Sequence, residues 1–304
     1  MKLTRMRLEY VNPWPNHAGM FIARKKGWYA DKGLDVDIVW DGWDRGTPVA
    51  LANRGEFQFA SVRLGELLET RQSSNPFVAV ATFNQNQLGG VITVKSSGIR
   101  SFADLEGKTV SIPPAPRLTE MVREAMAAEG ADYDKVNVQD PSPYEPDIRA
   151  VERGRYDAVF NVLGWESYQG SAPHDELVQL SFDEVGVTPH HAYFLCVRQQ
   201  LLDEQPELVR DFISATSRGY DFARNHQDES LQIMAPTMCN VEPEALSASL
   251  KYMSSTWHGP SGRWGEISEP LLYSYTKWMI DGGFCSASMD DIPGAWTNDF
   301  LPRA

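Results

Sequence analysis

One segment decides the fold: residues 12–40 read NPWPNHAGMFIARKKGWYADKGLDVDIVW. Asn16 is a residue type that caps helices, and the apolar spacing after it predicts a helix that begins near His17. Gly27 is expected to end this helix. Residues 34–40 then alternate between apolar and mostly acidic side chains, which predicts a strand.

A strand is also predicted before this helix. Residues 5–11 alternate in the same way, and Pro13 and Pro15 cannot continue the strand. The whole segment is therefore expected to form a β-α-β unit with parallel strands and a right-handed crossover. In such units the helix begins at the carboxyl edge of the sheet, where its unbonded N–H groups favour a polar ligand. Trp14 and His17 fall at that turn.

Composition and charge restrict the class of protein. The chain has 304 residues, of which 42% are hydrophobic and 23% charged, so it is expected to be globular and long enough for two lobes. It contains no apolar run of about 18 residues, so no membrane insertion is expected. The formal net charge is −13 and is spread along the chain. This argues against nucleic acid as a partner, because phosphate contacts need clustered Lys and Arg.

The N-terminus leaves the cellular location open. The first ten residues, MKLTRMRLEY, lack the apolar core of a secretory signal. The protein is therefore expected to be periplasmic or otherwise extracytoplasmic if a signal was removed, and cytoplasmic if not. The first strand begins almost at residue 3, which mildly favours a chain that never carried a signal.

The cysteines and histidines predict no metal site. Cys196, Cys239 and Cys285 lack zinc-type spacing, and an odd number gives no complete disulfide framework. Cys196 lies in an apolar run and is expected to be buried, whereas a bridge between Cys239 and Cys285 is left open. His190 and His191 are adjacent, so on a strand they point to opposite faces and do not easily share one metal ion.

An internal repeat favours two similar lobes. Residues 54–60 (RGEFQFA) and 153–159 (RGRYDAV) share the order Arg, Gly, charged, aromatic, polar, apolar. Each follows a stretch that is predicted to be helical, at 48–53 and 147–152. A helix that ends in Gly before a strand is common in α/β proteins, so the repeat alone leaves the question open.

The order of elements supports the two-lobe interpretation. A strand within 104–112 and a helix over 117–128 repeat the N-terminal order. Gly89-Gly90 and residues 184–189 are the expected crossings between lobes, which allows a hinge and an interlobe cleft. The expected boundaries are 1–89 for the first part of lobe I, 90–187 for lobe II and 188–304 for the return to lobe I. The returning part is expected to hold a strand at 192–197 and helices at 206–225, 242–253 and 269–281.

The chain resembles a known family over essentially its whole length. The matching motifs are Asn16-His17-Ala18-Gly19, the helix through Ala23, Gly27-Trp28-Tyr29, Gly33-Leu34-Asp35-Val36, Arg54-Gly55-Glu56-Phe57, Asp104-Leu105-Glu106-Gly107-Lys108 and Glu204-Gln205-Pro206-Glu207-Leu208-Val209-Arg210. They resemble the type II periplasmic solute-binding proteins of ABC importers. The most similar branch contains thiamine-pyrimidine-precursor binding proteins and the pyrimidine synthase of thiamine biosynthesis.

This resemblance implies a fold and a partner. The implied fold is α/β with two lobes, each a mixed, mostly parallel sheet flanked by helices, hinged by two crossings. An ABC permease is the implied partner if the protein is extracytoplasmic, and the chain is expected to be a monomer. The motifs specify the ligand poorly, because relatives bind sulfonates, nitrate, riboflavin and other heterocycles.

The synthase branch gives a direct test for enzymatic chemistry. The resemblance implies that a synthase would need a lysine for pyridoxal phosphate and a histidine consumed as substrate, where this chain has Val62 and Glu66. The cysteine-rich motif of that branch is replaced by residues 187–191, and Arg63 cannot form a Schiff base. A pyridoxal-dependent synthase is therefore disfavoured, and no cofactor is expected.

Candidate ligand contacts in lobe I follow the ends of predicted strands. Trp14 offers a ring that could stack on a heterocycle, unless it packs under its own loop. His17 could donate to a ligand acceptor or only cap its helix. Trp43 and Thr47 lie in a Gly-rich loop that could face the cleft or solvent. Uncharged polar side chains, which suit the edges of a neutral ring, complete the set: Asn16, Ser61, Asn84 and Asn86.

Candidate contacts in lobe II follow two predicted strands. Arg117 and Thr119 enter a helix, where relatives often hold an anionic or carbonyl group, although a solvated first turn fits equally well. Asn161, Trp165 and Glu166 follow the strand at 156–160. By resemblance to the pyrimidine-binding branch, Glu166 is expected to pair with an amino-pyrimidine edge. One of the two adjacent histidines, assigned here to His190, is expected to face the cleft.

These observations favour a binding protein that closes over a small, flat, heterocyclic ligand and delivers it to a transporter. The main alternative is a cytoplasmic enzyme on the same scaffold, such as a decarboxylase or another lyase acting on an aromatic acid, with His17, His190 or Glu166 as acid or base. A thiamine biosynthesis protein of the synthase type belongs to the same alternative. A ligand-sensing domain without transport is a third possibility.

Overall fold

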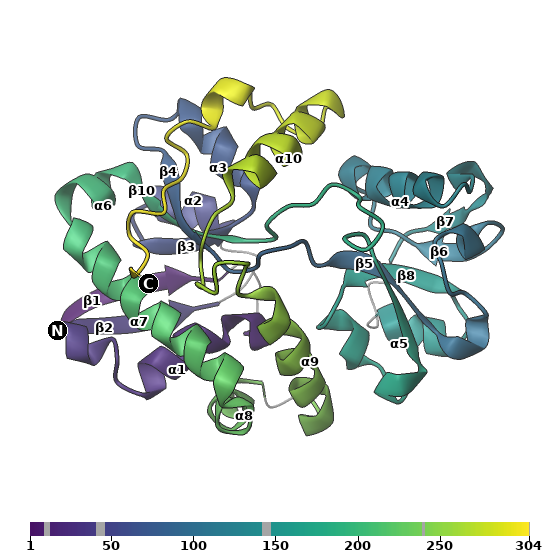
Figure 1. The fold of residues 1–304 in the computed structure, drawn as a ribbon, viewed down its shortest axis with the longest axis horizontal. Coiled ribbons are helices and arrows are strands. Elements are labelled where there is room, and N and C mark those ends of the chain that lie inside the picture. Colours follow the sequence, from purple (N-terminus) through teal and green to yellow (C-terminus); the bar gives the residue numbers. More distant parts are fainter. Residues whose placement is uncertain (9–12, 41–45, 142–146, 239–240, 304) are drawn as a thin grey trace. The chain divides into compact units, whose positions relative to one another are not determined.

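A computed structural model describes residues 1–8, 13–40, 46–141, 147–238 and 241–303 of the chain (Figure 1). The chain divides into two compact units. Unit 1 comprises Met1–Asn86 and His190–Ala304, and unit 2 comprises Gln87–Pro189. In the described part of the chain, no helix has both the length and the apolar character needed to cross a membrane.

Unit 1 is built on a five-stranded sheet in the order β2-β1-β3-β10-β4. Strands β1, β2 and β3 are parallel, and β10 runs antiparallel to both of its neighbours, β3 and β4. The strands are β1 (Lys2–Arg7), β2 (Leu34–Val39), β3 (Phe59–Val62), β4 (Phe77–Thr82) and β10 (Phe194–Arg198). Because β10 lies between β3 and β4, the returning part of the chain completes the sheet that the N-terminal part began.

Unit 2 repeats this plan with the order β7-β6-β8-β5-β9. Strands β6, β7 and β8 are parallel, whereas β5 is antiparallel to β8 and β9. The strands are β5 (Gly89–Val94), β6 (Thr109–Ser111), β7 (Asn137–Gln139), β8 (Ala158–Val162) and β9 (Leu177–Ser181). The predicted pair of mixed, mostly parallel sheets is therefore confirmed, and β1 and β3 correspond to β6 and β8.

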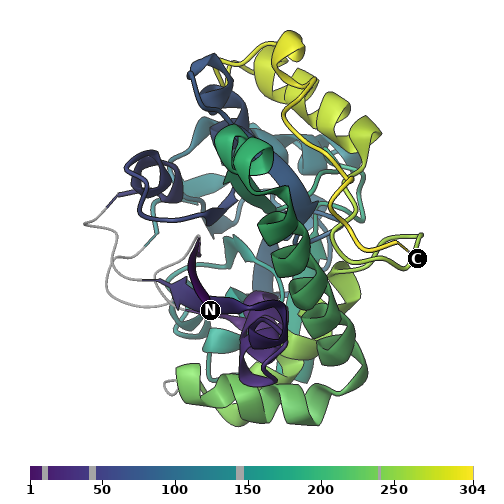
Figure 2. The same cartoon turned by 90° about the vertical axis from the view of Figure 1, so that its left-hand side faces the viewer.

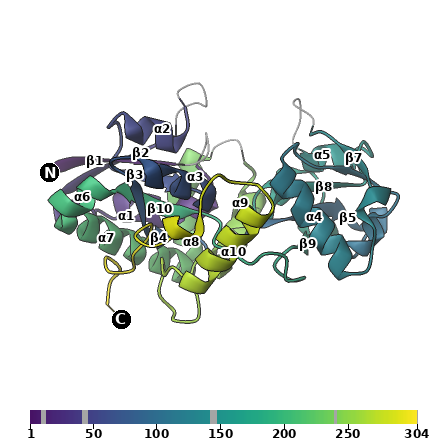
Figure 3. The ribbon, with the colours of Figure 1, turned by 90° about the horizontal axis from the view of Figure 1, so that it is seen from above.

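Helices cover both faces of the sheet of unit 1 (Figure 3). On one face, Ala60, Val62 and Cys196 form a core with α2, α3 and α10. On the other face, the Phe59 ring stacks on Phe212 of α7 at 3.8 Å between ring centroids. The helices of unit 1 are α1 (Ala18–Lys25), α2 (Pro48–Asn53), α3 (Leu64–Glu69), α6 (Gln199–Glu204), α7 (Pro206–Asn225), α8 (Gln227–Met234), α9 (Pro243–Thr256) and α10 (Glu269–Asp281). Unit 2 holds α4 (Pro116–Ala128) and α5 (Asp147–Glu152).

Helices α1 and α7 lie side by side and approach each other at glycines (Figure 2). A Cβ atom on Gly219 would lie 1.9 Å from the carbonyl oxygen of Gly19, and one on Gly19 would overlap the ring of Tyr220. Only glycine fits at these two positions. The contact fixes the start of α1, which follows the turn that carries Trp14 and His17.

Two details of the predicted N-terminal unit are wrong. The first strand begins at Lys2 rather than at residue 5, because it pairs with the second strand from Lys2 opposite Leu34 onward. Residues 9–11 of the predicted strand lie outside the described residues. The helix begins at Ala18, near His17 as predicted, but Asn16 uses its amide for distant partners instead of capping it, and a 3-10 turn at Pro15–His17 precedes the helix. Gly27, with a positive φ of 78°, follows the end of the helix as predicted.

Candidate functional site

The turn after β1 buries an aromatic cluster. Trp14 and His17 are both fully buried. The backbone N–H of Trp14 donates to Nδ1 of His17 at 3.3 Å, which places the proton of the neutral ring on Nε2. The Trp14 ring meets His17 edge-on at 5.8 Å between centroids and Tyr193 at 6.3 Å. The predicted pair thus lies together with Tyr193, which the sequence analysis did not select.

Asn16 and Asn84 form a reciprocal amide pair. Nδ2 of Asn16 donates to Oδ1 of Asn84 at 2.9 Å, and Nδ2 of Asn84 donates back to Oδ1 of Asn16 at 2.8 Å. Trp257 also donates to Oδ1 of Asn16 at 3.0 Å, and Asn84 donates to the Thr256 hydroxyl at 2.7 Å. Asn16 and Asn84, both predicted ligand contacts, therefore use their amides to connect segments that lie far apart in the sequence. These hydrogen bonds hold the turn that carries Trp14 in position.

His190 and His191 have separate partners. His190 stacks on Tyr275 with 3.7 Å between centroids and an interplanar angle of 3°. His191 donates from Nδ1 to the carbonyl oxygen of Asn84 at 3.1 Å and accepts the backbone N–H of Ser268 at Nε2, 2.9 Å away. Burial lowers the pKa of His191 to about 4, so this ring is neutral at pH 7. No group of three metal-ligating side chains occurs in the described ranges.

The other predicted contacts of unit 1 differ in their surroundings. Ser61 of β3 is fully buried, and among the described residues its hydroxyl has no hydrogen-bond partner. Thr47 is exposed and caps α2 by accepting the backbone N–H of Ala50 at 3.1 Å. Asn86 is half-buried. Trp43 lies outside the described residues.

In unit 2, Glu166 closes the turn after β8. Its Oε2 accepts the backbone N–H of Val162 at 2.6 Å. With its amide oriented to satisfy its neighbours, Asn161 donates from Nδ2 to the same Oε2 at 3.1 Å and to the carbonyl oxygen of Phe160 at 2.8 Å. Trp165 begins the 3-10 turn Glu166–Gln169 and is half-buried. The structure therefore brings these three predicted residues together.

The start of α4 holds the remaining predicted contacts. Nη1 of Arg117 lies 3.7 Å from Sδ of Met121, and the side chain of Thr119 hydrogen-bonds Tyr133. Ser111, the last residue of β6, was missed by the sequence analysis, and it is fully buried. The only signal for it was a small polar residue at the end of an apolar strand.

The positions that matter for the synthase chemistry have structural roles. Val62 is a fully buried core residue at the end of β3. The carboxylate of Glu66 accepts the backbone N–H of Arg63 at 3.2 Å and so caps α3. Neither side chain offers an amine or imidazole for pyridoxal chemistry.

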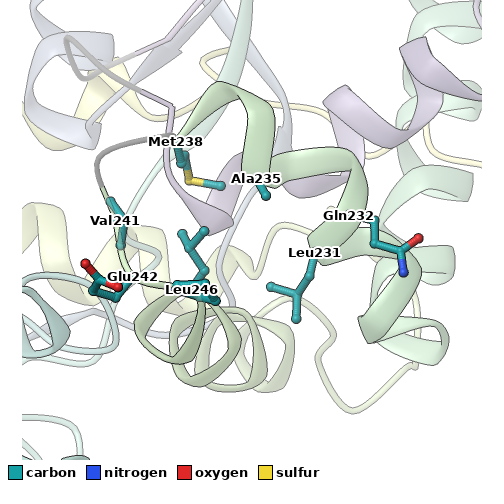
Figure 4. Close-up of a pocket in the computed structure, with 8 residues that line it drawn as sticks. Leu231, Gln232, Ala235, Met238, Val241, Glu242 and Leu246 are labelled. Carbon is teal, nitrogen blue, oxygen red and sulfur yellow. The ribbon is translucent and has the colours of Figure 1, made fainter.

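A separate apolar pocket of about 520 Å³ lies in unit 1 (Figure 4). Most of its lining side chains are hydrophobic and come from α8, α9 and the segment between them. The lining residues are Leu231, Gln232, Ala235, Met238, Val241, Glu242, Pro243 and Leu246. None of the predicted ligand contacts is among them.

The chain is similar in sequence to a known family and to proteins of thiamine metabolism. The family model described as NMT1/THI5 like matches residues 14–230. The formylaminopyrimidine-binding protein of Halalkalibacterium halodurans is 28% identical over 268 residues, covering 84% of this chain and 80% of that protein. The 4-amino-5-hydroxymethyl-2-methylpyrimidine phosphate synthase of Legionella pneumophila is 23% identical over 313 residues, covering 96% and 90%.

A solved structure confirms the predicted fold. The periplasmic aliphatic sulphonate binding protein SsuA from Escherichia coli superposes with a TM-score of 0.73, covering 100% of this chain and 95% of that chain. Its sequence identity is only 12%, so the likeness shows the fold alone. The chain thus has the two-unit architecture of a periplasmic binding protein.

Proposed function

This chain belongs to the NMT1/THI5-like family, and we propose that it captures a small planar heterocycle of the pyrimidine type for ABC-type import. A ligand-binding role is supported by the binding-protein fold and by the formylaminopyrimidine-binding relative. These two comparisons support ligand binding by this chain. That the ligand is a pyrimidine and that the protein delivers it to an importer are what we propose.

The observation that carries the proposal is the buried Ser61 hydroxyl, which has no partner in the described part of the chain and lies on β3, the strand that pairs with β1 before the Trp14 turn. Ser61 lies two residues after Phe59 and so projects from the same face of the sheet, the face that α7 covers. A serine hydroxyl both donates and accepts, which suits a ring edge with alternating amine and nitrogen groups. The ring of Trp14, which meets Tyr193 edge-on, is proposed to supply the planar surface for stacking.

The location and the partner follow from the same proposal. A carrier for an importer works outside the cytoplasm and meets its permease there. Fractionation of the native host cells checks this: recovery with the periplasmic or surface fraction is expected, and recovery only with the cytoplasm would contradict a transport role.

An enzyme on the same scaffold is the second candidate, and the synthase relative from Legionella favours it. The structure weighs against the pyridoxal route, because Val62 is a core residue and the Glu66 carboxylate caps α3. A lyase acting on an aromatic acid would instead have to use His17, His190 or Glu166. Of these, Glu166 already accepts the N–H of Val162.

Native mass spectrometry of the purified protein, followed by thermal-shift measurements, tests the two candidates. The compounds are formylaminopyrimidine, 4-amino-5-hydroxymethyl-2-methylpyrimidine, riboflavin, benzoate and an alkanesulfonate. Stabilisation by the aminopyrimidines without turnover is expected. Stabilisation by the sulfonate alone would contradict the proposal that the ligand is a heterocycle. Conversion of any bound compound would show that the protein is an enzyme rather than a carrier.

A further inference from the structure

Unit 2 contains a buried hydroxyl that the structure leaves without a function. Ser111 is fully buried, and in the described part of the chain its Oγ has no hydrogen-bond partner. Buried polar groups are almost always paired, and leaving one unpaired costs about 1–3 kcal/mol. A ligand group that bonds the hydroxyl would remove this cost, provided that the hydroxyl lies where a ligand is bound.

Ser111 stands where a ligand is expected in an α/β unit. It is the last residue of β6, the central strand of the three parallel strands β7, β6 and β8. The chain then leaves the sheet and enters α4 at Pro116. Ligands of open α/β sheets bind outside the carboxyl ends of the strands. In unit 1 the corresponding strand is β1, which precedes the turn that carries Trp14 and His17.

The strand register places Ser111 on the same face as a predicted ligand contact. Ser111 pairs with Val159 of β8, and paired residues of parallel strands project to the same side. Asn161 lies two residues after Val159 and shares that side. Its antiparallel partner on β5 is Gly90, which has no side chain. The hydroxyl and the amide of Asn161 therefore share one face at one sheet edge.

The partner is not expected to be an anion. Glu166 already accepts hydrogen bonds from Asn161 and Val162, so a carboxylate lies close to this edge. An anionic ligand group would be repelled by it, whereas an amine or ring N–H is favoured. A hydroxyl can donate to a ring nitrogen or accept from an amine, so it suits the same neutral heterocycle.

We propose that Ser111 is a ligand-contacting residue that hydrogen-bonds an uncharged amine, ring nitrogen or carbonyl group of the bound molecule. This inference rests on the proposed binding function. It assigns unit 2 its own specificity-determining hydroxyl, in addition to Ser61 in unit 1. Both hydroxyls lie in parallel strands, one in each sheet.

The test compares Ser111→Ala with Thr276→Val as the matched control. The Thr276 hydroxyl is also buried and without a partner among the described residues, but it lies in α10 and not in a strand of either sheet. Each substitution removes one unpaired hydroxyl, so both variants should unfold in urea at the same concentration as the wild type or a higher one. Only Ser111→Ala should bind formylaminopyrimidine more weakly, by about fivefold to tenfold in isothermal titration calorimetry.

Three results would overturn the assignment: unchanged affinity in Ser111→Ala, a lower urea midpoint in Ser111→Ala, or an equal affinity loss in Thr276→Val. A failure of the proposed function looks different, because the wild type itself then fails to bind the aminopyrimidines. If another compound of the thermal-shift panel binds instead, the same three proteins are compared with that compound. If none binds, the urea midpoint of Ser111→Ala still decides whether the hydroxyl has a structural partner.

Discussion

At the scale of single residues, the amide pair shows what a sequence cannot reveal. Asn16 reads as a helix cap, because capping is a local property of Asn before an apolar helix. Its true partner, Asn84, lies 68 positions further along the chain, and Trp257 lies 241 positions away. Local propensity carries no information about such partners. The sequence analysis selected both asparagines as ligand contacts, which stays a prediction, and it did not predict that they hydrogen-bond each other.

The first prediction concerns Trp14, whose replacement should lower both ligand affinity and stability, two effects that can be measured separately. Trp14→Ala should weaken an aromatic ligand by roughly 1 kcal/mol or more through lost stacking. The ring is fully buried, so the same change should also cost about 3–5 kcal/mol of unfolding free energy. Trp14→Phe keeps an aromatic ring and should retain most of both. Urea unfolding and calorimetry measure the two effects, and unchanged affinity in a folded Trp14→Ala variant would make Trp14 purely structural.

His191 gives a prediction for pH dependence. Its folded-state pKa is about 4, below the ordinary value of 6.5, because burial disfavours the charged ring. The unfolded state therefore binds more protons between these values, so stability is fully present above pH 6.5 and falls as pH drops toward 4. The loss should approach about 3 kcal/mol.

The comparison of slopes isolates this histidine. His191→Gln should show a flatter dependence of unfolding free energy on pH between 4 and 6.5, whatever its absolute stability. His174→Gln, at an exposed histidine of unit 2, should keep the wild-type slope. Equal slopes in all three proteins would show that His191 titrates normally in the folded state.

At the scale of elements, helices were predicted more accurately than strands. Four helices match the sequence prediction in both bounds: Pro48–Asn53, Asp147–Glu152, Pro206–Asn225 and Glu269–Asp281. Their signals are local, such as a proline in the first turn. The observed strand bounds differ from the predicted ones, because a strand begins where a neighbouring strand is available to pair with it. Thus β8 begins at Ala158, opposite Val110, rather than at residue 156.

Alanine substitution should change the free energy of unfolding in opposite directions at two helical glycines, one inside the contact between α1 and α7 and one outside it. Gly219→Ala should destabilise the protein by about 1–3 kcal/mol, because the new methyl group would lie 1.9 Å from the carbonyl oxygen of Gly19. Gly65→Ala, in α3, would meet only Sδ of Met279 at 3.9 Å and should stabilise by roughly 0.5–1 kcal/mol. Urea midpoints measure both. A neutral Gly219→Ala would mean that the two helices can separate without cost.

At the scale of the whole molecule, the fold was predictable and the ligand was not. The repeat at 54–60 and 153–159 and the family motifs specify elements and their order, which many family members share. The proposed ligand contacts Ser61 and Ser111 were found through hydroxyls that have no partner among the described residues, which becomes visible only when every neighbour is in place. A serine in a strand looks the same in sequence whether it is paired or not.

The sheet orders predict which part of the chain folds alone. Unit 2 is continuous, and all five strands of its sheet come from Gln87–Pro189. The segments that enter and leave unit 2 are held within it by hydrogen bonds. The side chain of Gln87 donates to the carbonyl oxygen of Val187, and the Thr188 hydroxyl donates to the carboxylate of Glu124 in α4. A fragment of residues 87–189, about 100 residues and within the usual domain range, should therefore unfold cooperatively in urea.

The matched control is the fragment of residues 1–86, which contains β1 to β4 but lacks β10. Because β10 lies between β3 and β4, this fragment leaves β4 without its strand partner and exposes the edge of β3. It should show no cooperative transition by circular dichroism. Adding residues 190–304 as a separate chain should restore the transition, because β10 and the helices of unit 1 then return. Cooperative unfolding of 1–86 alone, or its absence in 87–189, would contradict the division of the chain into these two units.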